Sequence, residues 1–362
     1  MNGDSRAPGP RRRLAISAFG IHTGGGLVLL RALMKAASGQ LRSALLDRRL
    51  QDDAALATGA ADVRYVDPTL IARVSSLAGM AAECVAGDVL LCFNSLPPLR
   101  PTAARVITFV QAPHMVGLAQ GVSYSAPVQL RVWLERLWLQ LGARHCNELW
   151  VQTRSMERAT QARFPHVLVR RVPLVDDRLL TLLQTARAGV AAPASPRPAP
   201  QDASFFYPAD GVSHKNHATL LQAWRLLQVE GMCPRLTLTL DASEFAAALL
   251  AAGLQAHDVP QVHSIGRQPR EAVLDRIQQA SALLFASRAE TFGLPMLEAR
   301  ALGVPILAGE RDFVRDVCTP AQTFDPTSPN SIVDAVRRFV AGAPAQLDEC
   351  CSAAQFVHRL QA

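Results

Sequence analysis

The sequence predicts an α/β protein with two doubly wound domains that face a central cleft. Short apolar segments alternate with helical patterns along the whole 362-residue chain, which is typical of parallel sheets covered by helices. Residues 186–204, with four prolines among alanines, interrupt this alternation and separate two halves of similar layout. At about 100–200 residues per domain, the length also fits two domains.

The individual elements follow from the apolar segments and the turn residues between them. In the first half we expect strands at residues 14–19, 63–66, 89–93, 106–110, 148–151 and 168–172, and a helix at 26–37 after a glycine turn. In the second half we expect strands at 204–207, 236–240, 262–265, 282–286 and 304–307, and helices near 216–229, 244–252, 269–280, 294–302 and 331–341. The predicted domains are residues 1–175 and 203–343, joined by a connection at 176–202, with a final helix at 344–362 that packs back on the first domain.

The composition excludes several classes of protein. With 49% hydrophobic and 19% charged residues, the chain can form a core in each domain and is not a disordered protein. No uncharged apolar run approaches the roughly 18 residues that a membrane-spanning helix needs, and we expect no secretory signal. Seven scattered cysteines without a C-x-x-C pair favour a reduced, cytoplasmic protein without a zinc site.

Positive charge is concentrated in the first half. Residues 1–175 hold 21 Lys and Arg against 11 Asp and Glu, a net charge of +10 in a chain whose total is +7. This asymmetry suggests an anionic partner such as a membrane surface or a phosphorylated acceptor. Nucleic acid is not expected, because the sequence has no aromatic-rich basic strand, zinc-finger spacing or recognition-helix signature.

The most informative motif is residues 287–299, Ser-Arg-Ala-Glu-Thr-Phe-Gly-Leu-Pro-Met-Leu-Glu-Ala, directly after a predicted strand. Gly293 permits a tight turn, and Pro295 is tolerated in the first turn of a helix. The free N–H groups of that helix start suit an anion such as diphosphate, and Glu290 and Glu298 on either side could accept hydrogen bonds from hydroxyl groups. The alternative is a solvated loop glutamate and an ordinary glutamate near a helix start.

A second motif, residues 205–217, also leads from a strand through a glycine loop to a helix. Only Lys35 and Lys215 among the 37 cationic residues are lysines, and Lys215 stands at the expected helix start, where its charge opposes the helix dipole. This placement favours phosphate binding. His214 and His217 have no third ligand at a suitable spacing, so we expect one of them to cap, pack or touch substrate rather than to bind metal.

Taken together, the two motifs resemble the donor domain of the retaining glycosyltransferases of family 4, which have the GT-B fold of two Rossmann-like domains. The pair Glu290 and Glu298 with Phe292-Gly293-Leu294-Pro295 between them is similar to the family signature, and residues 301–306 continue it. The resemblance extends over nearly the whole chain and is more specific in the second half. It implies an acceptor-binding first domain and a second domain that binds a nucleotide-sugar donor.

The resemblance also implies roles for single residues. Glu298 would hold the ribose, Glu290 the transferred sugar, and Lys215 the leaving diphosphate. The implied catalytic residues are Lys215, Glu290 and His114, and the implied donor-binding residues are Gly24, Gly25, Gly266, Arg267, Thr291, Phe292, Gly293, Leu294, Pro295 and Glu298. One departure concerns the arginine that the family often carries about five residues before the lysine, because Ala209 and Asp210 occupy that stretch here. Arg267 or Arg288 could replace it.

The expected activity is transfer of a sugar from a nucleotide-diphosphate sugar to a saccharide or lipid-linked acceptor, with retention of the anomeric configuration. The resemblance places it in bacterial surface polysaccharide or lipopolysaccharide synthesis, and we expect no metal and no cofactor other than the donor. Two alternatives stay open, an inactive GT-B scaffold that binds partners and a nucleotide-sugar epimerase of the same fold.

A membrane contact is the last expectation. Residues 125–144 interleave leucines, Trp133 and Trp138 with Arg131, Arg136 and Arg144. Such a stretch can lie at an anionic lipid interface, on the inner face of the cytoplasmic membrane, or it can be a domain helix with one apolar face on the sheet.

Overall fold

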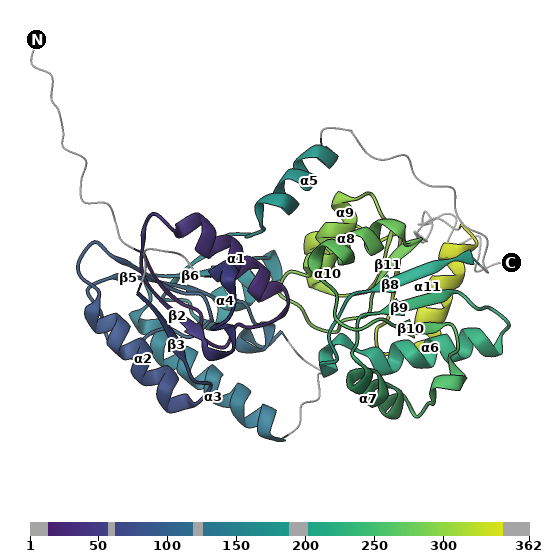
Figure 1. Cartoon of the computed structure of the whole chain (residues 1–362), viewed down its shortest axis with the longest axis horizontal. Coiled ribbons are helices and arrows are strands. Elements are labelled where there is room, and N and C mark those ends of the chain that lie inside the picture. Colours follow the sequence, from purple (N-terminus) through teal and green to yellow (C-terminus); the bar gives the residue numbers. More distant parts are fainter. Residues whose placement is uncertain (1–13, 57–61, 119–125, 188–201, 343–362) are drawn as a thin grey trace, which may run out of the picture.

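Two α/β domains lie side by side, each built around one parallel sheet (Figure 1). The computed structural model describes residues 14–56, 62–118, 126–187 and 202–342. The fold class predicted from the sequence, two doubly wound domains that face each other, is confirmed. The final helix expected at 344–362 lies outside the described residues.

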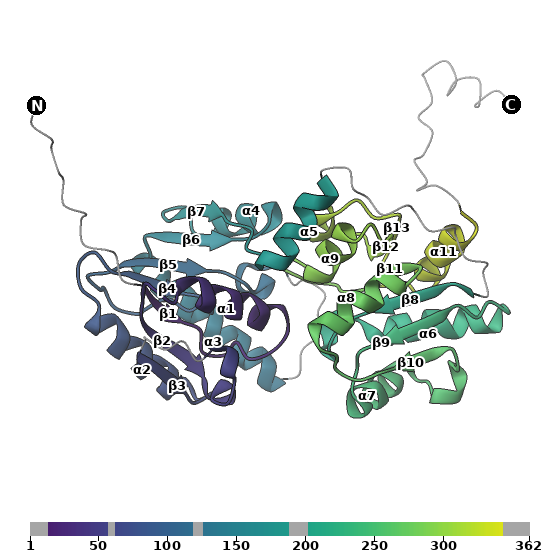
Figure 2. The same ribbon diagram turned by 45° about the horizontal axis from the view of Figure 1, so that its top comes forward.

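Within the described residues, the first sheet has seven strands in the order β3-β2-β1-β4-β5-β6-β7, all parallel (Figure 2). Successive side chains of a strand point to opposite faces, and Ala15 and Ile16 of β1 accordingly belong to different buried clusters. Both faces of the sheet are therefore covered, as is usual for parallel sheets. The strands are β1 (Leu14–Ser17), β2 (Leu41–Asp47), β3 (Asp62–Val66), β4 (Val89–Cys92), β5 (Arg105–Phe109), β6 (Glu148–Val151) and β7 (Leu168–Arg171).

Helices cover the two faces of the first sheet. Leu30 and Met34 of α1 are fully buried in one cluster, while Leu77 of α2 and Trp138 of α3 belong to the other. The Trp138 ring lies 6.3 Å from that of Phe19. The helices are α1 (Gly24–Ala37), α2 (Leu70–Glu83), α3 (Ala126–Gly142) and α4 (Arg154–Arg163).

The second sheet has six strands within the described residues, again all parallel, in the order β10-β9-β8-β11-β12-β13. Its core includes Phe205, whose ring packs edge-on against Trp224 at 5.7 Å. The strands are β8 (Ser204–Tyr207), β9 (Arg235–Leu238), β10 (Val262–Ser264), β11 (Ala282–Phe285), β12 (Ile306–Gly309) and β13 (Gln322–Phe324). The helices are α6 (His217–Val229), α7 (Ala242–Ala252), α8 (Arg270–Gln279), α9 (Leu294–Ala301), α10 (Asp312–Val317) and α11 (Pro329–Val340).

The two sheets reverse their strand order at equivalent places. The chain builds β2 and β3 on one side of β1 and β4 on the other, and it builds β9 and β10 on one side of β8 and β11 on the other. Open α/β sheets bind ligands outside the carboxyl ends of their strands at such a switch point. The loops that follow β8 and β11 are therefore the first place to look for a site.

Three features of the structure differ from the sequence prediction. Strand β2 was not expected, because Arg42 and Ser43 interrupt its apolar pattern. Strand β13 has only three residues and was not expected either. The segment 176–202, which we expected to be a connection, begins with helix α5 (Asp177–Arg187), and Leu179 of that helix is buried in the core.

Contacts between the domains come from several segments. α5 packs beside α9 of the second domain (Figure 1). Ser155 at the start of α4 donates a 2.6 Å hydrogen bond to Asp316 of α10. No helix in the described ranges is long and apolar enough to cross a membrane.

Candidate active site

An ion pair joins the two loops at the switch point of the second sheet. Lys215, in the loop after β8, donates a hydrogen bond from Nζ to Oε1 of Glu290, in the loop after β11. Ser287 also donates to this carboxylate oxygen at 3.1 Å. Less than a fifth of each side chain of the pair is exposed. The two residues singled out as catalytic in the second domain therefore lie together, although 75 positions separate them.

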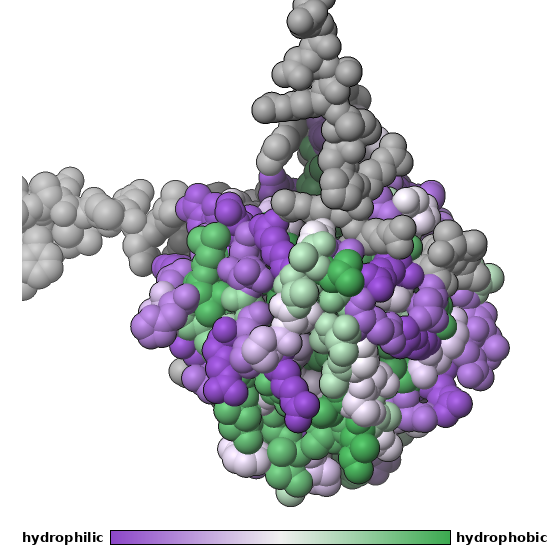
Figure 3. All heavy atoms as spheres, turned by 90° about the vertical axis from the view of Figure 1, so that its left-hand side faces the viewer, coloured by the Kyte–Doolittle hydropathy of each residue, from purple (hydrophilic) through white to green (hydrophobic). Residues whose placement is uncertain are grey.

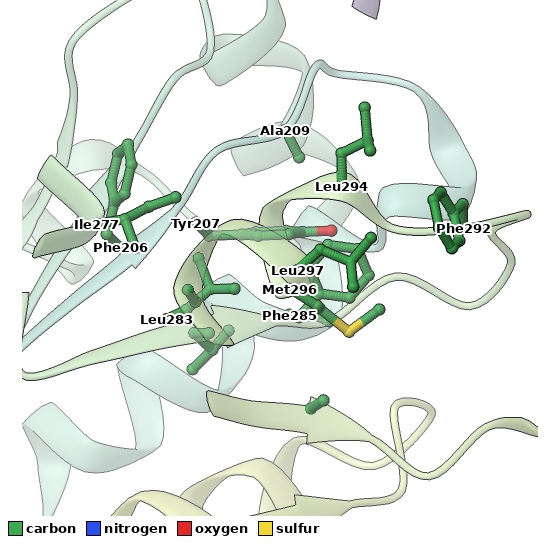
Figure 4. Close-up of a cluster of buried hydrophobic side chains, with 14 of the residues drawn as sticks. Phe206, Tyr207, Ala209, Ile277, Leu283, Phe285, Phe292, Leu294, Met296 and Leu297 are labelled. Atoms are coloured by element: carbon green, nitrogen blue, oxygen red, sulfur yellow. The ribbon is translucent and has the colours of Figure 1, made fainter. Parts of the chain in front are cut away.

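The backbone around Lys215 is held by residues of β8 and β11. Residues Ser213–Lys215 form a single 3₁₀ turn, and α6 begins at His217, slightly later than the sequence predicts. The hydroxyl of Tyr207 donates to the Lys215 carbonyl at 2.8 Å. Tyr207 is held in turn by the core, where its ring lies 5.8 Å from that of Phe285 on the neighbouring strand (Figure 4).

Electrostatics keep Lys215 charged. Burial acts to lower the pKa of its ammonium group, but attraction to Glu290 and Asp210 outweighs burial and raises the pKa above its ordinary value. Asp210 stands in the stretch where the resemblance leads one to expect arginine. Its Oδ1 is buried and has no hydrogen-bond partner among the described residues. Two acids therefore influence the one lysine.

Two helices begin at the cleft from opposite domains. Gly293 precedes α9 with φ of 68°, and a Cβ at this position would lie 2.4 Å from the Met296 side chain, so only glycine fits without rearrangement. Gly25 in the first turn of α1 approaches so closely that a Cβ there would lie 3.1 Å from Cδ1 of Leu294. The two helix starts therefore face each other, with the Leu294 side chain against Gly25.

The three glycines predicted as a turn form the first turn of α1, which begins at Gly24. A helix start tolerates glycine because its first N–H groups have no intrahelical partners. Those groups and the dipole of α1 favour an anion, as does the start of α9. The arrangement can bind a diphosphate between two helix starts, with the Lys215 ammonium as the nearby cation.

Glu298 is the buried acid of the site. Burial raises its pKa, and the opposing attraction of Arg270 offsets only part of this effect. Arg270 donates a 3.0 Å hydrogen bond to Oε1 of Glu298 and also lies 2.6 Å from Oδ2 of Asp176, just before α5. The carboxylate can accept hydrogen bonds from neighbouring hydroxyl groups such as those of a ribose.

His114 is the predicted catalytic residue of the first domain and lies in a 3₁₀ turn after β5 (Pro113–Val116). Its Nε2 is buried and lies 3.7 Å from Oε2 of Glu135, and Arg136 donates to its carbonyl at 2.6 Å. His114 is close enough to His214 of the second domain to contribute to lowering its pKa, a shift caused mainly by burial. His114 thus lies at the cleft.

The remaining predicted residues occupy different places. Gly266 has φ of 71°, and Arg267 beside it donates to Oε1 of Glu244 at 2.9 Å rather than to the lysine loop. Arg288 donates to the Thr219 hydroxyl at 3.1 Å, and its Nε is buried without a hydrogen-bond partner among the described residues. Thr291, Phe292, Leu294 and Pro295 lie in the loop and first turn around Gly293.

Sequence reasoning missed three residues of the site. Arg270 contacts both Glu298 and Asp176 only in the folded chain, and nothing in the sequence pairs positions that far apart. Ser287 could have been found, because it belongs to the motif and directly follows the strand. His217 packs 5.2 Å from the Tyr207 ring, and packing is one of the roles expected for one of the two histidines.

The two facing parallel sheets define the GT-B fold, and comparison with known proteins agrees. Residues 193–354, somewhat less than half of the chain, match the model of the family "Glycosyl transferases group 1". No curated protein matches the sequence significantly.

Three solved structures are similar over nearly the whole chain. Sucrose-phosphate synthase from Thermosynechococcus elongatus is 16% identical, with a TM-score of 0.65 over 91% of this chain and 90% of that one. HepE from Anabaena, in complex with UDP and glucose, is 12% identical, with a TM-score of 0.60 and the same two coverages. A UDP-forming α,α-trehalose-phosphate synthase from Burkholderia vietnamiensis is 10% identical, with a TM-score of 0.61 over 91% and 92%. At these identities the likeness shows the fold.

Proposed function

We propose that the protein transfers a sugar from a nucleotide-diphosphate sugar to a saccharide or lipid-linked acceptor. The observation that carries this proposal is the position of the Lys215 ammonium beside Glu290, at the edge where the starts of α1 and α9 face each other. A diphosphate needs such a cation and free N–H groups. The family match of residues 193–354 and the UDP complex of the similar HepE structure support the same donor class.

The proposed chemistry is electrostatic. The bond between the sugar C1 and the diphosphate oxygen breaks as negative charge accumulates on the leaving diphosphate, which Lys215 and the N–H groups near Gly293 stabilise. The acceptor hydroxyl attacks from the face that the diphosphate leaves, and the diphosphate oxygen takes its proton. The anomeric configuration is then retained, and neither a dedicated base nor a metal ion is required.

Other residues position the donor in this proposal. Glu298, with its carboxylate held by Arg270, accepts hydrogen bonds from the ribose hydroxyls, and Glu290 accepts from the transferred sugar. His114 contacts that sugar from the first domain. Gly266 lets the backbone approach the base.

A cytoplasmic membrane surface is the proposed partner of the first domain, and surface polysaccharide or lipopolysaccharide synthesis is the proposed pathway. Leu130, Trp133, Leu137 and Leu141 form a row on the solvent side of α3, each at least 40% exposed. Figure 3 shows hydrophobic side chains gathered along the lower part of this end of the molecule. Arginines and the charge of +10 in residues 1–175 complement an anionic lipid surface.

An inactive scaffold is the second candidate, and Asp210 is the observation that favours it. The half-buried Asp210 carboxylate near Lys215, with one oxygen buried, reduces the attraction of this edge for a diphosphate. Donor hydrolysis in the absence of acceptor separates the two candidates, because an enzyme of this kind slowly releases nucleoside diphosphate and a scaffold does not.

A thermal-shift panel of UDP-, GDP- and ADP-sugars is the direct test of donor binding. One nucleotide sugar should raise the melting temperature of the wild type and should raise that of Lys215→Ala less. A panel in which no nucleotide sugar raises the melting temperature would contradict the proposed function. Once the donor is identified, analysis of the products formed with saccharide and lipid-linked acceptors determines the linkage.

A further inference from the structure

A second cavity in the first domain has a composition that the donor site does not explain. A cavity of about 330 Å³ lies between the start of α2 and the outer part of α3, and arginines and apolar side chains line it together. Its members follow several strands at their carboxyl ends, as Pro68 follows β3 and Leu96 follows β4. The cavity is therefore on the cleft edge of the first sheet.

Its charges favour an anion. Arg49, Arg73 and Arg131 line the cavity with a single acid, Glu135. Arg73 is the decisive residue, because its side chain is only 14% exposed and its nearest carboxylate in the described residues, that of Glu135, is 3.8 Å away. Its Nε is buried without a hydrogen-bond partner. A buried cation so poorly paired is costly, and a bound anion would remove that cost.

Its walls favour an apolar chain next to that anion. Leu70, Leu130 and Trp138 line the cavity, and Leu70 and Leu130 are also about half exposed at its outer side. From Leu130 the exposed row of α3 continues through Trp133 and Leu137. A sugar phosphate would leave this surface uncovered, whereas a phosphorylated lipid would bury it.

The inner end of the cavity reaches the reaction cleft. Glu135 approaches His114 at 3.7 Å, and Arg49 lies 2.8 Å from Nε2 of His22, just before the first turn of α1. Arg49 is itself held by hydrogen bonds to Asp47. Burial acts to raise the pKa of Asp47, but hydrogen bonds from Arg49 and Gly20 outweigh it and lower the pKa to about 2. An acceptor bound here by its phosphate could extend a hydroxyl toward His114.

We propose that this cavity is the acceptor subsite for the phosphate group of a lipid-linked acceptor, with Arg73 as its principal ligand and Leu70 and Leu130 against the first carbons of the lipid chain. The inference rests on the proposed function, because it names the acceptor class of the same enzyme. It assigns specificity to residues outside the donor site.

Calorimetric titration with soluble probes tests the subsite without turnover. The probes are octyl phosphate, octyl glucoside, glucose 6-phosphate and inorganic phosphate. Octyl phosphate should bind at least tenfold more tightly than each of the others, because only it offers both the charge and the chain. Equal or tighter binding of glucose 6-phosphate or octyl glucoside would overturn the proposal, the first indicating a sugar phosphate and the second a merely apolar groove.

Variants then locate the binding. Arg73→Met keeps an apolar stem and should weaken octyl phosphate binding tenfold or more, and Leu130→Ser, at an exposed position that folding tolerates, should weaken it several-fold. The matched control is Arg144→Met, an exposed arginine in a different cavity of about 600 Å³ at the amino ends of β4 and β5. Unchanged binding in both Arg73→Met and Leu130→Ser, or a loss in Arg144→Met instead, would overturn the assignment.

The failure of this inference is distinguishable from failure of the proposed function. The thermal shift produced by the active nucleotide sugar should be the same in Arg73→Met and the wild type, because Arg73 is not among the donor-site residues. A wild type that binds nucleotide sugars but not octyl phosphate rejects only the subsite. A wild type that binds octyl phosphate but no nucleotide sugar rejects the transferase proposal.

Discussion

Arg270 holds the carboxylate of Glu298 through a 3.0 Å hydrogen bond, across 28 positions of the second domain. The same guanidinium lies 2.6 Å from Asp176, at the point where the chain leaves the first domain. Glu298 is thus kept oriented by a cation that has a second carboxylate partner. A ligand that takes up one oxygen of Glu298 therefore does not leave Arg270 unpaired.

Replacement of Glu298 by Gln should separate stability from donor binding. Burial raises the pKa of Glu298, so ionising this group in the folded protein lowers the free energy of unfolding. The loss develops as pH rises through the folded-state pKa and is present at pH 7.5. The ligand-free variant should therefore melt at the same or a higher temperature. Its KM for the nucleotide sugar should rise by about 10- to 100-fold, as for loss of a hydrogen bond to a charged group.

Steady-state kinetics and a melting curve check this prediction. Glu310→Gln is the matched control, since Glu310 is an exposed acid that is also paired with an arginine, Arg315, at 2.6 Å. The control should leave KM unchanged. An unchanged KM in Glu298→Gln would remove the ribose role from Glu298.

Lys215→Ala should lower kcat by about 100-fold or more while the protein stays folded, because charge on the leaving diphosphate loses its ammonium group. The chain offers an unusually close control. Lys35→Ala removes the only other lysine, which is exposed on α1, and changes the net charge equally. Rates of nucleoside diphosphate release with saturating donor and acceptor compare the two, and equal rates would exclude Lys215 from catalysis.

The site was more predictable from the sequence than its surroundings. Glu290, Gly293 and Lys215 could be placed because each lies in the loop that follows a short apolar strand, and strands of a parallel sheet present such loops at one edge. The pairing of Arg270 with Asp176 could not, because it depends on how α5 packs beside α9. Nor does composition reveal that a segment read as a connection begins with a helix.

In the fold, too, some elements could be predicted from the sequence and others could not. Strands β8 and β11 are apolar apart from Ser204 at the start of β8, and both were predicted within a residue. β2 was not expected because Arg42 and Ser43 break its pattern, although Ser43 is buried. Similarly, the predicted apolar face of α3 is only part of its surface. Trp138 packs inward, but Trp133 is exposed on the opposite side, which periodicity alone does not distinguish.

The exposed row on α3 predicts salt-sensitive membrane binding. Trp133→Ser with Leu137→Ser should reduce flotation with anionic liposomes several-fold, and salt should reduce flotation of the wild type, because both apolar and charged contacts contribute. Leu250→Ser, at an exposed position on α7 in the second domain, is the control and should float as the wild type does. Flotation that neither salt nor the double variant reduces would argue against this surface.

Acid should destabilise the protein through His217. Burial is the largest cause that lowers the pKa of His217 to about 4, so the folded protein keeps it neutral where the unfolded chain protonates it. The resulting stability is present above the unfolded value of 6.5 and is lost as pH falls toward 4. Between pH 7 and pH 5 the loss amounts to about 2 kcal/mol.

Urea unfolding at the two pH values measures this effect. His217→Phe keeps a ring against Tyr207 and should lose about 2 kcal/mol less than the wild type between pH 7 and pH 5. His257→Phe, at an exposed position, should behave as the wild type does. The prediction fails if the two variants show the same pH dependence.

The close approach of Gly25 to Leu294 predicts that a side chain at position 25 separates the two helix starts. A Cβ on Gly25 would lie 3.1 Å from Cδ1 of Leu294, so Gly25→Val should push α1 from α9 and lower kcat/KM tenfold or more. Gly39→Val, where a Cβ meets nothing within 4 Å, should have little effect on kcat/KM. Adding Leu294→Ala to Gly25→Val makes room for the new side chain. The double variant should therefore lose less kcat/KM than the two single variants combined. Additive losses in this cycle would show that Gly25 acts through something other than its contact with Leu294.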